Sequence, residues 1–248
     1  MMSQIRHLPL APTGQRPLAP GAGIDAHRHD THQIAYACRG VVSVTTGTGA
    51  WVAPANRAIW IPAGTVHEHR AHGDTDLRLV GLTRNPLGLD RPAVLAVGPL
   101  LRELLVAYTT DDAHAHHGGE RERLLAVLLD QLRAAPEQPL HLPTPRDPRL
   151  AAVCDALRRD PSDGRTLDRL AAGAGSSDRT LSRLFRAELG MTFPQWRTQL
   201  RLHHALLLLA EGVAVTTVAH RCGWASASAF IEVFRRSFGY TPGRAFTT

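Results

Sequence analysis

The sequence predicts a multidomain α and β protein, with a β-rich N-terminal part and an all-helical C-terminal part. β-branched and aromatic runs with Gly, Pro and Asn between them fill residues 22–83, which is typical of short strands. Leucine stripes at helical spacing follow at 98–109 and 119–134. From residue 149 the pattern indicates consecutive short helices, in two similar units joined by a longer helix. A chain of 248 residues is long enough for two such parts, each with its own core.

The strand-like runs are IAYACRG, VVSVTTGTG, WVAPANRAIWIPAG and LRLVGLT. We expect them to form separate strands of a small β-sandwich or β-barrel. Residues 1–21 lack the continuous apolar stretch of a signal peptide, so we expect a leader or loop there. Between the two leucine-rich helices, a loop carries His114, His116 and His117, which we expect to be solvent-exposed or to form a minor metal-scavenging site.

The segment 135–148, APEQPLHLPTPRDP, is polar and rich in proline, as linkers are. It places a boundary near residue 145. The predicted division is 1–97 for the β-rich domain, 98–145 for a helical linker that could dimerise, and 146–248 for the helical domain.

Charge is unevenly distributed along the chain. All 28 basic residues are arginine, and the formal net charge is +6. From Asp147 onward there are 14 arginines against 9 acidic residues, whereas the preceding residues carry 14 against 13. A basic C-terminal part indicates a nucleic-acid partner. No run approaches the ~18 apolar residues of a membrane span, and three scattered cysteines predict no disulfide framework and fit a reducing cytoplasm.

The helical part begins with a helix-turn-helix pattern. Thr166 can cap one helix, Gly173 and Gly175 mark a tight turn, and Ser177 can cap the next helix. That second helix places Leu181, Leu184 and Phe185 at core spacing, which leaves an outer face of Arg179, Ser182, Arg183 and Arg186. An arginine-rich outer face is what major-groove reading requires.

The pattern then repeats after a long helix that is expected to run from Pro194 to Gly212. A further helix, a turn at Gly223 and a capping Ser226 precede a second outward face, formed by Ala227, Ser228, Ile231, Glu232 and Arg235. Two recognition helices on one module could enter major-groove segments about 34 Å apart, one turn of DNA.

Residues 148–246 resemble the AraC/XylS family of bacterial regulators, through SSDRTLSRLFRAELGMTFPQWRTQLRL and VAHRCGWASASAFIEVFRRSFGYTPGRAF. The resemblance implies base contacts from Arg179, Ser182 and Arg183 and from Ala227, Ser228, Ile231 and Glu232. Arg183 is the foremost candidate, because arginine can bind guanine bidentately. Arg186, Arg235 and Arg236 are expected to contact phosphates. The alternative without a DNA-binding role is that these arginines form only a solvated helix face.

The β-rich part carries a histidine pattern. His27, His29 and Gln33 share strand parity and point to one face, and His67 follows a turn containing Pro62 and Gly64. Three imidazoles and an amide oxygen that converge in a barrel would suit one divalent transition metal ion, such as Zn, Ni, Fe or Mn.

The arrangement resembles the two cupin motifs, whose metal ligands are two His, a Glu and a third His. Here Gln33 holds the Glu position. The resemblance implies a cupin-like β-barrel that acts as a sensor. His69 shares parity with His67 and could be an extra ligand or a pocket wall. Three alternatives remain open: an effector bound without metal, a purely hydrogen-bonded polar pocket, and a pH sensor based on imidazoles that titrate near pH 6.5.

The sequence therefore predicts a cytoplasmic, homodimeric transcription regulator that binds double-stranded promoter DNA and responds to a small molecule or a metal ion. It is not expected to be an enzyme. The alternative is a metal-dependent cupin enzyme fused to a DNA-binding module. A DNA-repair regulator with a reactive thiol is disfavoured, because its cysteine-rich zinc site has no counterpart in Cys38, Cys154 and Cys222.

Overall fold

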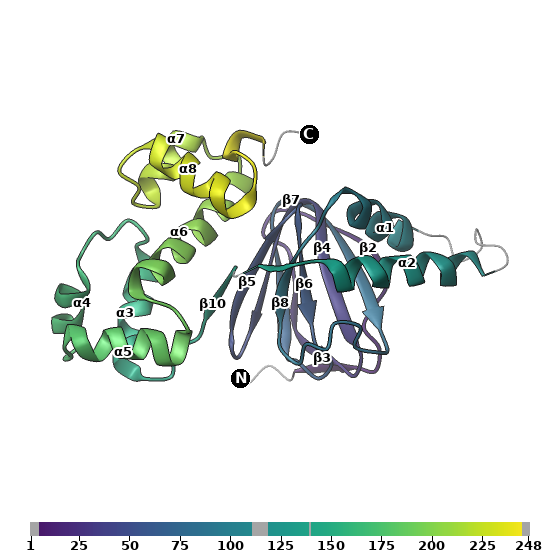
Figure 1. Ribbon diagram of the computed structural model, residues 1–248, viewed down its shortest axis with the longest axis horizontal. Helices are drawn as coiled ribbons and strands as arrows, with labels where there is room; N and C mark the ends of the chain where they lie inside the picture. Colours follow the sequence, from purple (N-terminus) through teal and green to yellow (C-terminus); the bar gives the residue numbers. More distant parts are fainter. Residues whose placement is uncertain (1–4, 111–118, 139, 245–248) are drawn as a thin grey trace. The chain divides into compact units, whose positions relative to one another are not determined.

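The computed structural model describes residues 5–110, 119–138 and 140–244, and the chain forms two compact units (Figure 1). The first unit comprises Met1–Gly47 and Trp51–Leu140, and the second comprises His141–Thr248 together with Thr48–Ala50. The first is rich in strands and the second is helical, which confirms the predicted fold class. In the part of the chain that is described, no helix is both long and apolar enough to cross a membrane.

The strands of the first unit form one sheet that curves into a barrel (Figure 1). The strand order is β1-β3-β7-β4-β6-β8-β9; in addition, β2 pairs with β7 and β5 pairs with β4. Their bounds are β1 Arg6–Leu8, β2 Gly14–Leu18, β3 Gly23–His29, β4 His32–Thr46, β5 Gly49–Pro54, β6 Arg57–Ile61, β7 His67–Leu82, β8 Ala93–Ala96 and β9 Glu137–Gln138.

The expectation of two separate strands in IAYACRG and VVSVTTGTG is wrong, because IAYACRG and the first six residues of the second run, VVSVTT, both lie in β4. The pairing of β4 with β7 shifts register on both sides of Arg39, as β-bulges do. Gly40 adopts φ 79° there, a conformation open to glycine. A bulge bends a strand without ending it, so the glycine that suggested a turn lies inside a long strand.

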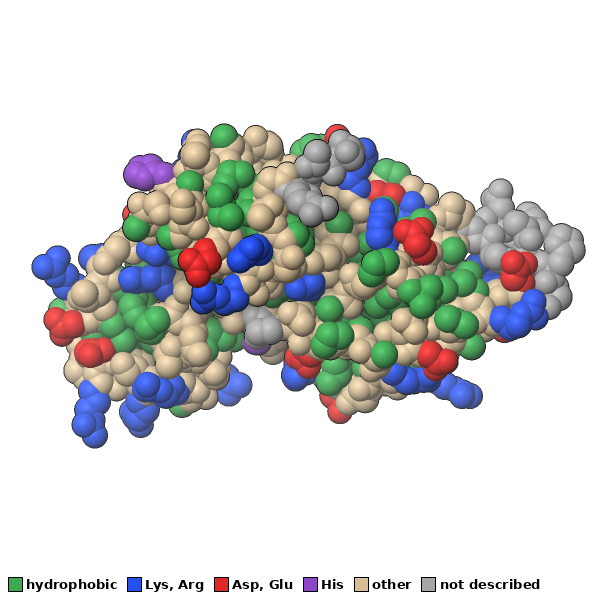
Figure 2. All heavy atoms as spheres, turned by 45° about the horizontal axis from the view of Figure 1, so that its top comes forward, with side chains coloured by type: hydrophobic (Ala, Val, Ile, Leu, Met, Phe, Trp, Pro, Cys, Tyr) green, Lys and Arg blue, Asp and Glu red, His purple; other side chains and the backbone are tan. Residues whose placement is uncertain are grey.

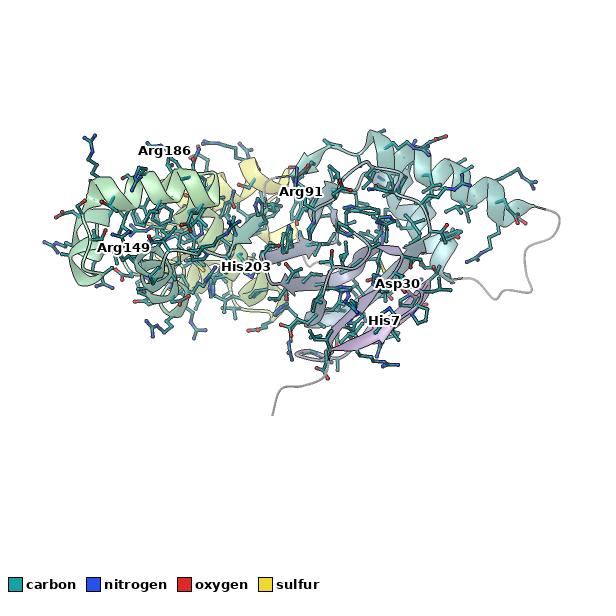
Figure 3. All side chains as sticks on the ribbon, turned by 90° about the horizontal axis from the view of Figure 1, so that it is seen from below. His7, Asp30, Arg91, Arg149, Arg186 and His203 are labelled. Atoms are coloured by element: carbon teal, nitrogen blue, oxygen red, sulfur yellow. The ribbon has the colours of Figure 1, made fainter. Side chains whose placement is uncertain are left out.

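The expectation of a leader or loop before residue 22 is also wrong in part. β1 pairs in parallel with β3, and β2 pairs antiparallel with β7. The Nε2 atom of His7, in β1, lies 3.0 Å from a carboxylate oxygen of Asp30, just after β3. Both side chains are labelled in Figure 3. These strands lie at the surface and carry mostly exposed residues, so they lack the apolar alternation by which a strand is detected in sequence.

Two helices, α1 (Pro99–Thr110) and α2 (Glu120–Ala134), cover one face of the sheet, close to the ranges predicted for them (Figure 1). Their leucines, including Leu105 and Leu128, share a core with Ile34, Tyr36 and Trp60 of the sheet. Since side chains alternate along a strand, Gln33 and Ala35 point to the opposite, inner face. His114, His116 and His117 lie outside the described residues.

The second unit begins with β10 (His141–Pro143) and continues with helices. These are α3 Pro148–Arg159, α4 Leu167–Gly173, α5 Asp178–Leu189, α6 Phe193–Ala210, α7 Val215–Arg221, α8 Ala227–Phe238 and the 3₁₀ turn η1 Pro242–Arg244. The predicted caps are confirmed: the side chains of Thr166, Ser177 and Ser226 accept hydrogen bonds from the first turns of α4, α5 and α8. Two helix-turn-helix units thus flank α6.

Candidate metal centre and candidate DNA interface

Four histidines from two strands meet inside the barrel. His27 and His29 lie on β3, and His67 and His69 lie on β7, where His27 pairs with His67 across the strands. All four are buried. Ring centroids of His27 and His67 lie 4.3 Å apart, and those of His29 and His67 lie 4.9 Å apart. One potential ligand atom from each of His27, His29 and His67 lies within 4.8 Å of the others, so the three predicted imidazoles do converge.

Backbone carbonyls fix which ring nitrogen of each imidazole is free. The Nδ1 atoms of His27, His29 and His67 donate to the carbonyls of Asp25 at 2.8 Å, Thr31 at 2.6 Å and Thr65 at 2.8 Å. A carbonyl only accepts, so each Nδ1 carries the proton and each Nε2 keeps its lone pair. Among the described residues, the Nε2 atoms of His29 and His67 have no hydrogen-bond partner. This is the tautomer that binds a metal through Nε2.

Burial lowers the pKa of two of these rings, His29 and His67. Desolvation lowers the pKa of His67 from 6.5 to about 4, with a smaller lowering by His27 and His29, while its bond to the Thr65 carbonyl opposes the shift. Desolvation likewise lowers the pKa of His29. Neutral imidazole is the form that binds metal ions, so His29 and His67 are ready for a cation at neutral pH. The same shifts place the titration of His29 and His67 below pH 6.5, which argues against these two rings as sensors of near-neutral pH.

Gln33 and His69 complete the polar part of the interior. Gln33 is fully buried, and its side chain lies next to the ring of His29 without a well-formed hydrogen bond in the described chain. His69 lies with its ring 5.0 Å from His67 and 5.8 Å from His27, and both of its ring nitrogens are unpartnered among the described residues. A buried polar group without a partner costs about 1–3 kcal/mol. The lone pairs of His29, His67 and Gln33 therefore fit a cation, with His69 beside it in the wall of the interior.

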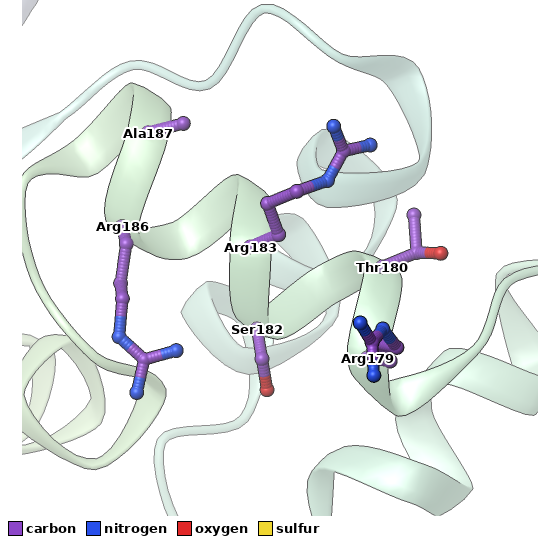
Figure 4. A pocket seen from close by; sticks show the side chains of 6 residues that line it. All are labelled: Arg179, Thr180, Ser182, Arg183, Arg186 and Ala187. Carbon is purple, nitrogen blue, oxygen red and sulfur yellow. The ribbon is translucent and has the colours of Figure 1, made fainter.

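The outer face of α5 forms the first candidate DNA-binding surface. Arg179, Arg183 and Arg186 are exposed and Ser182 is half-buried, while Leu181, Phe185 and Leu189 on the opposite side are buried. The predicted residues line a shallow hollow with Thr180 and Ala187 (Figure 4). Within residues 140–244, none of the three arginines forms an ion pair, so their charge is available to a polyanion. Figure 2 shows arginine side chains, in blue, projecting from the helical unit.

The outer face of α8 forms the second candidate DNA-binding surface. Ser228, Glu232, Arg235 and Arg236 are exposed, and Ala227 and Ile231 are half-buried. Its other side carries Phe230, Phe234 and Phe238 into the core. Arg236 lies 2.7 Å from Glu232, one turn away, so part of its charge is compensated on the helix itself. This face is accordingly less basic than that of α5.

The cysteines do not form a reactive centre. Cys154 and Cys222 are buried, and burial raises their thiol pKa values to about 12 and about 11. Cys38 is half-buried and donates a hydrogen bond to Asp76 at 3.0 Å; desolvation, with help from Asp76, raises its pKa. All three are free thiols. Because a thiolate is the reactive form, these sites do not support a thiol-based repair function.

A barrel with a buried histidine cluster and a module with two helix-turn-helix units together define a DNA-binding transcription regulator with a cupin domain. In agreement, residues 17–83 match the family described as cupin domain, and residues 170–247 match a helix-turn-helix domain. The chain is similar to the HTH-type transcriptional regulator NimR of Escherichia coli (strain K12), with 33% identity over 221 residues, which cover 88% of this chain and 80% of NimR. It belongs to the AraC family of transcription regulators.

A second relative is the HTH-type transcriptional regulator RipA of Corynebacterium glutamicum, 39% identical over 107 residues, or 43% of this chain and 31% of RipA. Among solved structures, the DNA-binding domain of AdpA in complex with a target DNA is 35% identical, with a TM-score of 0.37, over 40% of this chain and 88% of that one.

Proposed function

We propose that this AraC-family regulator binds one divalent transition metal ion in its cupin domain and couples that binding to recognition of promoter DNA. The ion would be Zn, Ni, Fe or Mn, held by His27, His29 and His67 through Nε2 and by Gln33 through its amide oxygen. The convergence of three buried imidazoles with fixed Nδ1–H groups carries this proposal. An organic effector bound in the same polar interior is the alternative form of sensing.

DNA recognition is assigned to the two outer helix faces. We propose that Arg179, Ser182 and Arg183 read bases from α5, with Arg183 the main specificity contact. Ala227, Ser228, Ile231 and Glu232 would add a weaker reading from α8, because that face offers few donors. Arg186, Arg235 and Arg236 would contact phosphates, which give affinity without sequence information. The arginines of α5 are exposed and form no ion pair within residues 140–244, which supports α5 as the main reading helix.

We further propose that the regulator works as a homodimer in the cytoplasm. Leu100 of α1 and Val127 of α2 are large hydrophobic residues with 55% and 45% of their surface exposed. The two helices that carry them pack against each other, and exposed apolar residues on both suit a symmetric contact between two copies. A reducing compartment would keep the three cysteines as thiols. Metal or effector binding would then favour one arrangement of the two DNA-binding modules.

Metal content of the full chain, purified without an affinity tag or a chelator, tests the sensor. We expect close to one ion per chain by elemental analysis, and loss of that ion in the double variant His27→Ala/His67→Ala. His72→Ala is the matched control, since His72 lies on the same strand but contacts Ser43 instead of the cluster. An absence of metal after reconstitution would overturn the metal proposal and leave an organic effector.

We propose a sensor without catalysis, because the relatives found are regulators. The metal-loaded protein should then change its DNA affinity on metal removal while turning over no oxidisable or isomerisable small molecule. Turnover that disappears in His27→Ala/His67→Ala would contradict this and establish the enzyme alternative.

A further inference from the structure

The segment that joins α3 to α4 is tightly folded on its own acidic side chains. Asp160 accepts hydrogen bonds from the backbone amide of Ser162 at 3.0 Å and from its hydroxyl at 2.5 Å. Asp163 forms an ion pair with Arg165 at 2.6 Å and also accepts from its backbone amide. These local bonds make residues 160–165 a rigid strap that leads directly into α4, the first helix of the first helix-turn-helix unit.

Two arginines of the joining helix α6 hold this strap. Arg201 Nε donates to the carbonyl of Pro161 at 3.1 Å, and Arg197 donates to the carbonyl of Arg165. The two arginines lie four residues apart, so they occupy the same face of α6. Both are partly buried, and burial lowers their pKa values from the usual range. The strap is therefore attached to α6 through backbone carbonyls.

The turn of the second helix-turn-helix unit lies against the strap and Arg201. Gly223 adopts φ 74° in this turn. A Cβ atom there would stand 2.6 Å from Arg201 Nη2 and 2.8 Å from Ser162 Cα, so only glycine fits between them. The guanidinium carbon of Arg201 also lies 5.9 Å from the centre of the Trp224 ring. Arg201 thus contacts both the strap that leads into the first helix-turn-helix unit and the turn of the second helix-turn-helix unit.

We infer that Arg201 is a positioning residue that fixes the geometry between the two reading helices and thereby sets the spacing of the two DNA half-sites that this protein accepts. The inference rests on the proposed reading of DNA by both α5 and α8. The Arg201 side chain joins the strap, α6 and the Gly223 turn. The two helix-turn-helix units therefore cannot rotate independently about α6. Two rigidly linked helix-turn-helix units gain affinity from each other only on DNA where both can bind their half-sites at the same time.

Binding of full-length protein to a series of duplexes tests this. The duplexes carry the two half-sites selected by the wild type, at the selected spacing and with one or two base pairs added or removed. We expect the wild type to lose at least about tenfold in affinity for a one-base-pair change. Arg201→Met keeps the stem of the side chain but removes its donors, so the ratio between spacings should fall toward one. Affinity for a duplex with the α5 half-site alone should stay at the wild-type value.

Arg159→Met, which removes one exposed arginine from α3, is the control for lost charge and should keep the wild-type spacing ratio. If Arg201→Met does not fold by circular dichroism, Arg201→Gln replaces it, because glutamine is too short to bridge Pro161 and Trp224. A folded Arg201 variant with the wild-type spacing ratio would overturn the inference. A wild type that gains nothing from the second half-site would instead refute reading by α8, on which the inference depends.

Discussion

His27 on β3 and His67 on β7 are paired across their strands, and the Nδ1 atom of each donates to the carbonyl of the residue two positions before it. The backbone of β3 and of the turn before β7 thus holds both rings in one tautomer and turns both Nε2 atoms into the same space. Because both rings are also buried, and burial lowers the pKa of His67, the cluster is arranged for a ligand before any ligand arrives.

Gln33→Glu should strengthen metal binding. A carboxylate is a stronger, charged ligand than an amide, so we expect affinity to rise at least about tenfold. In the metal-free protein the same carboxyl group would be buried, which costs stability. Isothermal titration with metal and thermal unfolding in a chelator measure the two effects. A Gln33→Leu control should weaken binding, and equal affinities for all three proteins would exclude residue 33 from the ligand set.

His69→Leu should keep the metal and stabilise the metal-free protein. The three ligand atoms that lie together belong to His27, His29 and His67, whereas both nitrogens of His69 are buried without partners among the described residues. Removing them should raise the free energy of unfolding by about 1–3 kcal/mol. Urea unfolding in a chelator checks this. Loss of the metal in this variant would instead identify His69 as a ligand.

Arg183→Ala and Arg186→Ala should weaken DNA binding in different ways. Arg183→Ala should cost about 1–3 kcal/mol on the selected site and little on random DNA, because a base contact is lost. Arg186→Ala should weaken binding to both by a similar factor and reduce the salt dependence by about one counterion. Fluorescence anisotropy at several salt concentrations separates the two outcomes. A uniform loss for Arg183→Ala would make it a phosphate contact.

Leu100→Glu together with Val127→Glu should convert the dimer into a monomer. Both residues are exposed within one chain, so charges there should leave the fold intact while they oppose contact between two copies. Size-exclusion chromatography with light scattering gives the mass. Leu10→Glu, at a residue with 66% of its surface exposed in the same unit, is the matched control and should stay dimeric. A wild type that is already monomeric would refute the dimer.

His72 should make stability depend on pH. Its ring lies 2.9 Å from the Ser43 hydroxyl, and burial, with a smaller effect of Arg70, lowers its pKa from 6.5 to about 4. Between these values the unfolded chain binds a proton that the folded chain does not, so stability is lost as the pH falls from 6.5 toward 4. His72→Asn should remove about 1 kcal/mol per pH unit from that slope in a chelator. Equal slopes in urea unfolding would contradict this.

Much of the site could be predicted because alternation along a strand is a local rule. Shared parity places His27 and His29 on one face of β3, and the structure brings His67 to the same space. Gln33 lies on the next strand, β4, so the expectation that it shares a strand with these histidines is wrong, although its side chain is also buried. The caps at Thr166, Ser177 and Ser226 were equally local and are confirmed. That these residues bind metal or DNA, and that the chain divides at residues 97 and 145, stay predictions.

What could not be predicted depends on contacts between distant segments. β1 and β2 are held by backbone pairing with β3 and β7, which leaves no apolar pattern in their own residues. The continuity of β4 depends on bulges opposite β7. Arg201 looks like any helix arginine in the sequence, because its partners are a carbonyl 40 residues away and a glycine that has no side chain to signal the contact.

The carbonyls that orient the three imidazoles belong to Asp25, Thr31 and Thr65, and any amino acid at those positions would present the same oxygen. The orientation of the three imidazole rings therefore does not depend on which side chains stand at these three positions. Substitution of the exposed Asp25 or the half-buried Thr65 would therefore change the surroundings of the pocket while the direction of each Nε2 stays set by the backbone.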